Sequence, residues 1–183
     1  IGGADFVSKP PIMAELVARL RRHMTLYRKT KKLESLIFID PLTHLPNASK
    51  FQEVLNIEWA RCARYWHHLT LLIIKVDNLD DIREQDGNDK YFSTIAAVAD
   101  GLASAGNRPG DLVATLGNDK FAILLSDCGH EGANLKAKQI KQRFENGELA
   151  KTAPQLSCTI AYAVAAPAGS GSPEVLFRAV DNL

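Results

Sequence analysis

The sequence predicts an α/β (α+β) sandwich, and three observations lead to that prediction. Apolar, strand-like runs alternate with amphipathic helical stretches along residues 40–183. Two of these runs, Leu112–Leu116 and Phe121–Leu125, lie on either side of Gly117-Asn118, a dipeptide typical of tight hairpin turns. Apolar side chains make up 46% of the 183 residues, which is enough for the core of a full domain.

Residues 1–39 predict a short strand followed by a long basic helix. The strand is Asp5–Ser8, and Pro11 suits the first turn of a helix that extends from Ile12 to about Ile39. In the second half of this helix, three apolar residues keep a spacing of roughly seven: Leu26, Leu33 and Ile37. Such a spacing is typical of a two-stranded coiled coil. A surface helix with a narrow apolar stripe fits the same pattern, so both interpretations stay open.

Helices and strands continue to alternate after Asp40-Pro41, which ends the first helix. Helices are expected where apolar residues recur at three- and four-residue spacing, and strands where short apolar runs are bounded by turn residues. The expected elements are a helix from Asn47 to about His67, a strand His68–Val76, a short helix Leu79–Gln85, a turn at 86–88, a helix Tyr91–Ala105, the hairpin, a helix from about Gly132 to Phe144, a strand Leu156–Ala165 and a helix from Pro173.

Composition and charge exclude several classes of protein. The formal net charge is +1, from 22 basic and 21 acidic side chains, which argues against a general nucleic-acid or membrane-surface binder. No signal peptide or apolar run of membrane-spanning length is visible, so we expect no membrane insertion. Cys62, Cys128 and Cys158 lack metal or redox spacing and predict reduced thiols in a cytoplasmic protein. Both ends look cut, so we expect further domains beyond them.

The hairpin carries a motif that points to a family. The segment Gly117–Phe121, read as GNDKF, resembles the GGDEF motif of diguanylate cyclases. Asp40–Asn47 resembles the opening DxLTGLxN segment of that family, with His44 where glycine is usual, and Leu71–Asp77 resembles its first strand. Residues 40–183 therefore resemble a degenerate GGDEF domain. The resemblance implies a ferredoxin-like palm sheet with flanking helices, as in nucleotide cyclases, preceded here by the long N-terminal helix.

The N-terminal segment resembles the end of a response-regulator receiver domain. The run from Gly3 to Pro10 carries a lysine before a proline, and in that family this lysine reaches the phosphorylated aspartate. The resemblance assigns phosphate sensing to Lys9. It implies three parts: a receiver fragment at 1–24, a helical stalk at 25–39 and the degenerate GGDEF domain at 40–183. It also implies a phosphorelay with an upstream sensor kinase, and a homodimer formed through the N-terminal helix.

The resemblance implies that the family's reaction is lost. Diguanylate cyclases hold Mg²⁺ with acidic residues at the positions of Lys75 and Asp119, and the position of Lys120 is also acidic in that family. The three side chains here sum to +1, and two ammonium groups repel a divalent cation by several kcal/mol. We expect no catalytic metal, no required cofactor and no cyclase activity. We also expect Lys75 to form an ion pair with Asp119 in place of the metal.

The substrate contacts of the family change as well. The resemblance places Arg83 where a guanine-reading asparagine is usual, Phe92 where its partner aspartate is usual, and Asp80 where a phosphate-binding lysine is usual. The acidic residues Asp77, Asp80 and Asp81 favour a solvated loop over a metal site. The sequence thus predicts an altered nucleotide cleft.

A different ligand site is predicted just before the hairpin. The RxxD sequence Arg108–Asp111 resembles the family's product-inhibition site, where arginine grips a phosphate and stacks on guanine, and aspartate accepts from the guanine edge. This resemblance implies cyclic di-GMP as ligand. Gln139 lies near the position of a further family arginine, with Lys138 or Lys141 as weak substitutes. The motif is short, however, and an aspartate also suits the start of a strand.

The leading interpretation is a catalytically inactive GGDEF signalling module of a two-component response regulator. Its role is regulation or dimerisation, with cyclic di-GMP bound through Arg108 and Asp111. Two alternatives stay open: an active diguanylate cyclase that joins two GTP molecules, and a nucleotide-free scaffold that controls a C-terminal phosphodiesterase domain. The sequence does not identify the output partner, the kinase or the oligomeric state.

Overall fold

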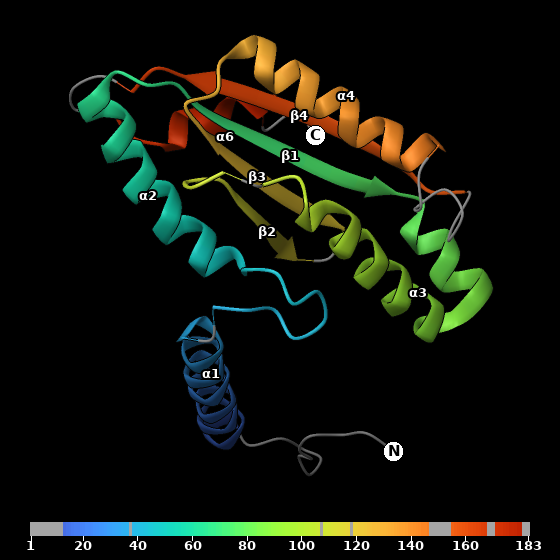
Figure 1. Ribbon diagram of the computed structural model, residues 1–183. Helices are drawn as coiled ribbons and strands as arrows, with labels where there is room; N and C mark the ends of the chain where they lie inside the picture. The colour runs from blue at the N-terminus through green and yellow to red at the C-terminus, as the bar shows by residue number, and fades with distance from the viewer. Residues whose placement is uncertain are drawn as a thin grey trace. The chain divides into compact units, whose positions relative to one another are not determined.

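A four-stranded antiparallel sheet forms the centre of residues 38–183 in the computed structural model (Figure 1). The structure describes residues 13–36, 38–106, 108–117, 119–146, 155–167 and 171–180. Within these ranges the strands are β1 (Leu69–Asp77), β2 (Leu112–Gly117), β3 (Lys120–Ser126) and β4 (Ser157–Ala165). Their spatial order is β2-β3-β1-β4, which is the ferredoxin-like order. The predicted α+β palm fold is confirmed.

Helices connect and cover these strands much as the sequence predicts. They are α1 (Met13–Leu36), α2 (Ala48–Tyr65), α3 (Leu79–Ala103), α4 (His130–Asn146) and α6 (Glu174–Val180). The crossovers from β1 to β2 and from β3 to β4 run through α3 and α4. The predicted strand Asp5–Ser8 and the predicted phosphate-sensing Lys9 lie outside the described residues.

Local signals explain where α2 begins and ends. The side chain of Asn47 accepts a hydrogen bond from the Lys50 amide at 3.0 Å, which caps the first turn. At the other end Trp66 takes a left-handed conformation (φ 59°), and its amide donates to the Cys62 carbonyl. The apolar face of α2 packs on the sheet, with Phe51 and Leu55 almost fully buried.

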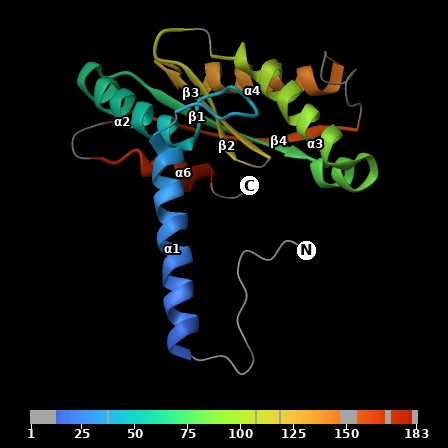
Figure 2. The same cartoon turned by 90° about the horizontal axis from the view of Figure 1, so that it is seen from below.

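Helix α3 consists of two pieces joined at Gly87. This residue has φ 83° and ψ 176°, a conformation outside the helical region that glycine adopts most readily. Figure 2 shows the two pieces meeting at an angle. The sequence predicts a short helix, a turn at 86–88 and a longer helix here. The structure confirms the break and shows that helical hydrogen bonding resumes directly after it.

The core has two layers, one on each face of the sheet. Side chains of α3 and α4 pack on one face, and those of α2 and α6 pack on the other. Strand β1 contributes side chains to both layers, because successive side chains point to opposite faces of the sheet. Leu72, Ile74 and Val76 join the first layer, whereas Leu69, Leu71 and Ile73 join the second. Burial on both faces explains why this strand is apolar almost throughout.

Residues 1–37 form a separate unit, described here through α1 alone. Its exposed apolar side chains recur at steps of four and three along the first half of the helix: Met13, Val17, Leu20 and Met24. Leu26 is also exposed, whereas Leu33 and Ile37 lie outside the residues whose side chains are described. The dimer stalk stays a prediction, as does the division of residues 1–39 at residue 24. No described helix has both the length and the apolar character needed to cross a membrane.

Candidate functional site

The β2–β3 hairpin and the end of β1 meet at one edge of the sheet. Gly117 pairs with Lys120, so the predicted hairpin is confirmed, and Asp119 lies in the turn just before Lys120. Gly117 has φ 98°, which favours glycine. The Val76 amide of β1 donates to the Asp119 carbonyl at 2.8 Å, fixing the loop beside the strand end. Phe121 enters the core with no exposed surface.

Lys75 and Lys120 stand directly opposite each other in this edge. They are cross-strand partners in the β1–β3 register, and both are half-buried. Like charges at opposed positions are unfavourable. The expected ion pair between Lys75 and Asp119 is not formed among the residues that the structure describes. That expectation was wrong because Asp119 lies in the hairpin loop, one residue before the position that faces Lys75.

The open cleft at this edge has a volume of about 590 Å³, and both acidic and basic side chains line it: Lys75, Asp77, Asp80, Asp81, Arg83 and Asp119. Asp80 and Asp81 are exposed, as predicted for a solvated loop. Asp77 differs, because its Oδ2 accepts hydrogen bonds from Ser157 at 3.3 Å and from Thr159 at 3.0 Å. Strand β4 therefore holds this carboxylate, a contact that the sequence analysis missed.

Arg83 in the same cleft contacts its own helix. Its Nε donates to Asn88 Oδ1 at 3.0 Å, and its guanidinium lies 5.1 Å from the centre of the Tyr91 ring. Phe92 packs against Tyr91 with its ring centre at 5.4 Å and remains 46% exposed. Among the described residues, no group of three or more His, Cys, Asp or Glu side chains converges as metal ligands would.

A second site lies at the opposite end of β2, in the turn Arg108–Asp111. The Asp111 amide donates to the Arg108 carbonyl at 2.9 Å, which closes the turn. The Asp111 carboxylate accepts from the Arg108 amide and from the Ser126 amide, both at 3.2 Å. Gly110 has φ 92°, so the turn uses a conformation that favours glycine. Asp111 is thus oriented by two backbone donors.

Next to this turn is a cavity of about 340 Å³, which lies within the size range of small-molecule sites. Arg108 and Asp111 line one side, and Lys136 and Gln139 of α4 line the other. The Arg108 side chain is exposed and has no ion pair with another described residue. Gln139 lies where the sequence places it. Lys138 and Lys141 instead line a separate cavity, so Lys136 is the lysine that joins this site.

The three cysteines are free thiols, as predicted. Burial raises the pKa of Cys62 and of Cys128, the second of which lines the turn cavity. The pKa of Cys158 is raised to about 12, first by burial and then by the negative charge of Asp77. These thiols remain protonated near neutral pH, so they are poor nucleophiles.

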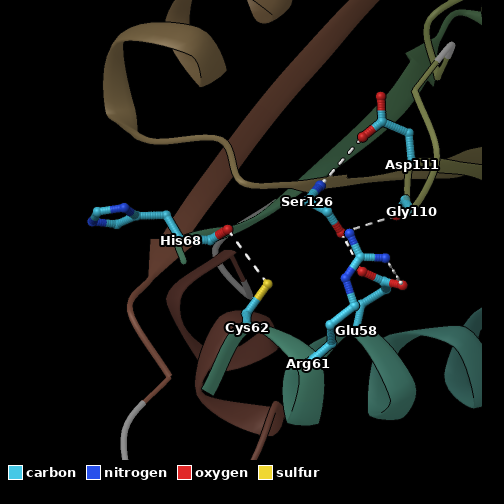
Figure 3. A network of polar contacts seen from close by, with 7 residues as sticks. All are labelled: Glu58, Arg61, Cys62, His68, Gly110, Asp111 and Ser126. Atoms are coloured by element: carbon cyan, nitrogen blue, oxygen red, sulfur yellow. Dashed lines mark hydrogen bonds and ion pairs between the residues drawn. The ribbon is translucent and has the colours of Figure 1, made fainter. Parts of the chain in front are cut away.

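Sequence reasoning missed the residue that lies under the turn. Glu58 of α2 is 6% exposed, and its Oε2 accepts from the Ser126 hydroxyl at 2.5 Å (Figure 3). Phe51, Leu55, Glu58 and Cys62 follow each other at steps of four, three and four, which places this glutamate on the apolar face of the helix. A charged residue within an apolar stripe was the available signal.

Comparison with known proteins identifies the family. The family described as "Diguanylate cyclase, GGDEF domain" matches residues 37–183. The chain belongs to the GGDEF family. It is 27% identical over 135 residues to DgcC of Escherichia coli, a probable diguanylate cyclase, which covers 74% of this chain and 36% of DgcC. It is 30% identical over 114 residues to a diguanylate cyclase of Vibrio cholerae, covering 62% and 35%. The chain thus spans about a third of the length of these relatives.

Solved GGDEF structures share the fold. The coiled coil and GGDEF domain of DgcB from Caulobacter crescentus, in complex with c-di-GMP, covers 92% of this chain and 90% of its own, with a TM-score of 0.70 and 16% identity. The GGDEF domain of YfiN from Pseudomonas aeruginosa covers 76% and 87%, with a TM-score of 0.66 and 26% identity. The chain is therefore a GGDEF domain related to diguanylate cyclases, and its fold matches that of a domain solved with c-di-GMP.

Proposed function

We propose that this GGDEF domain does not synthesise cyclic di-GMP and instead binds it as a regulatory ligand. The proposal rests on the contrast between the two ends of β2. At one end an arginine and an oriented carboxylate face an open cavity. At the other end, two lysines oppose each other where cyclases use acidic residues to hold metal. The domain would receive the signal molecule of its family without making it.

The loss of catalysis is supported by the charge of the cleft. Mg²⁺ prefers carboxylate oxygens and water as ligands. Lys75 and Lys120 supply ammonium groups instead, and Asp77 is already hydrogen-bonded to two hydroxyls of β4. Asp119 is the remaining carboxylate beside the hairpin. These residues do not fit a pair of catalytic metal ions, so we assign no reaction step to this cleft.

Binding of cyclic di-GMP is supported by the chemistry around Arg108. A guanidinium grips phosphate oxygens in a bidentate manner and stacks on a purine ring. Asp111 has its carboxylate fixed by two backbone amides and retains lone pairs for the N–H groups of a guanine edge. Lys136 adds a positive charge across the cavity. An anionic ligand with guanine bases matches this set.

The N-terminal helix provides the proposed link to signalling. We infer that α1 pairs with its copy in a homodimer, because apolar side chains with coiled-coil spacing are exposed along it. The similar chain of DgcB also combines a coiled coil with a GGDEF domain. In this proposal a sensor kinase phosphorylates an upstream receiver domain, and the stalk transmits the change to the GGDEF domains.

Calorimetric titration with cyclic di-GMP tests the binding proposal. The wild-type chain should bind, and Arg108→Ala should weaken binding by roughly 100-fold, because a charged hydrogen bond and a stacking contact are both lost. Arg64→Ala is the matched control, since Arg64 is an exposed arginine on α2 outside the cavity. Absence of binding heat with the wild type would favour the nucleotide-free scaffold.

A further inference from the structure

A buried glutamate supports the ligand-binding turn from below. Glu58 projects from α2 toward Gly110 of the turn, and its side chain is 8% exposed (Figure 3). Its Oε1 lies 3.2 Å from the Arg61 guanidinium, whose side chain is 46% exposed. A buried carboxylate paired with a half-solvated arginine adds little net stability compared with an apolar side chain. Stability alone therefore does not account for a glutamate at this position.

Ser126 connects Glu58 to both parts of the turn. Its hydroxyl lies 2.5 Å from Glu58 Oε2 and 3.1 Å from the Gly110 carbonyl oxygen. A hydroxyl has one proton, so the Glu58 carboxylate and the Gly110 carbonyl share it in a three-centre hydrogen bond, and Glu58 as the stronger acceptor fixes the serine side chain beside the turn. The amide of the same serine donates to Asp111 Oδ1 at 3.2 Å. One residue thus fixes the turn backbone and the carboxylate that faces the ligand cavity.

The packing around Gly110 shows how closely these groups meet. A Cβ atom at position 110 would lie 2.9 Å from Ser126 Oγ and 3.0 Å from Glu58 Oε2. Both distances are shorter than ordinary contacts, so the turn backbone rests directly on the serine and the glutamate. The glycine is needed for this approach as well as for its φ of 92°.

We propose that Glu58 is a positioning residue for the ligand site: through Ser126 it holds the Arg108–Asp111 turn in its binding conformation. This inference rests on the proposed binding of cyclic di-GMP at that turn. Glu58 makes no contribution to the cavity wall itself, so its effect on the ligand is indirect. Because Glu58 belongs to α2, the first helix after the stalk, the position of α2 and the order of the turn depend on each other.

The decisive variant is Glu58→Met, which removes both hydrogen-bonding oxygens and keeps an unbranched side chain of similar length. Methionine suits an apolar helix face, so the unfolding free energy should stay level or rise. Binding of cyclic di-GMP should nevertheless weaken about tenfold, because the turn loses its support. Hydrogen exchange at the Asp111 and Ser126 amides should accelerate by a similar factor.

Glu53→Met is the matched control. Glu53 lies on the same helix and also pairs with a basic residue three positions away, Lys50 at 3.2 Å, but it is exposed. The Glu53→Met variant should leave the affinity for cyclic di-GMP and the amide hydrogen exchange at the turn unchanged. Ser126→Ala should resemble Glu58→Met, and the double variant should bind no more weakly than either single variant, since both act through one contact.

Two results separate this inference from the proposed function. If the wild type does not bind cyclic di-GMP, the proposed function fails, and amide exchange at Asp111 and Ser126 alone decides the role of Glu58. If Glu58→Met lowers stability while exchange at the turn matches the Glu53→Met control, Glu58 is a structural residue and the inference is overturned. Wild-type affinity in a well-folded Glu58→Met variant would overturn it as well.

Discussion

The turns at the two ends of strand β2 have similar backbone conformations but different side chains. Gly117 ends the strand at the hairpin, and Gly110 stands just before its start; both have positive φ. At the hairpin, Lys75 opposes Lys120, and the nearby Asp119 is left without an ion pair among the described residues. At the other turn, backbone amides fix the Asp111 carboxylate.

This comparison shows that the backbone geometry of a turn can be kept while the chemistry of its side chains changes. The hairpin keeps its glycine, its register and its buried Phe121 although two lysines stand at its edge. The turn at Arg108–Asp111 keeps both its geometry and an exposed arginine beside a cavity. A fold match therefore supports the architecture of both sites, whereas function depends on the particular side chains.

The largest expected effect distinguishes the two glycines. Gly110→Ala should lower the unfolding free energy by about 3 kcal/mol, because the added methyl meets Ser126 and Glu58 in addition to the strain of positive φ. Gly117→Ala should cost only about 1 kcal/mol, since no other described residue approaches its Cβ position within 4 Å. Urea denaturation of both variants measures the difference. Equal losses would contradict the close packing described for the Arg108–Asp111 turn.

A pH-dependent effect of intermediate size is expected from a buried thiol of β4. Cys158 pairs with Val76 in the register of β4, and its pKa is raised from 9.0 to about 12. Between these values the unfolded chain loses the thiol proton while the folded chain keeps it, so stability falls as the pH rises. The expected loss is about 2 kcal/mol between roughly pH 8 and pH 10.5. Cys158→Ala should lack this part of the loss, and identical pH profiles for the two proteins would refute the prediction.

The smallest expected effect concerns the opposed lysines. Lys120→Glu replaces a like-charge pair with an opposite-charge pair facing Lys75, and should raise the unfolding free energy by about 0.5 kcal/mol at low ionic strength. Salt should reduce the gain. Lys138→Glu, at an exposed position on α4, changes the net charge equally without altering the pair. A similar gain in that control would show that total charge, and not the pair, is responsible.

Much of this architecture follows from local sequence signals. Asn47 marks the start of α2, Gly87 marks the break in α3, and the apolar run of β1 predicts a strand buried on both faces. The hairpin follows from two apolar runs around Gly117-Asn118. These features depend on residues close together in the chain, so periodicity and turn chemistry are sufficient to predict them.

Contacts between distant residues could not be predicted in the same way. Asp77 meets Ser157 and Thr159 only because β1 and β4 are neighbours in the sheet. Arg143 of α4 donates a hydrogen bond to the Gly101 carbonyl of α3 at 2.6 Å, a contact between residues 42 positions apart in the chain. The mistaken ion pair between Lys75 and Asp119 has the same origin, because the strand register decides which residues face each other.

The contacts under the Arg108–Asp111 turn combine a local sequence signal with a contact between distant residues. Glu58 could be noticed in the sequence because it is a charged residue within an apolar helix stripe. No local pattern identifies its partner Ser126, which lies 68 residues further along the chain. The pair Arg108 and Asp111 could be predicted as a sequence motif. The cavity beside it, and the contribution of Lys136, could not, because they depend on the packing of α4 beside the turn.

Cyclase turnover tests the central claim most directly. Purified protein is incubated with GTP and Mg²⁺, and cyclic di-GMP is quantified by chromatography, with an active diguanylate cyclase as the positive control. We predict no product above a protein-free blank, because Lys75 and Lys120 occupy the edge where metal ligands are needed. Product that increases with protein concentration and requires Mg²⁺ would contradict the account and identify the domain as a working cyclase.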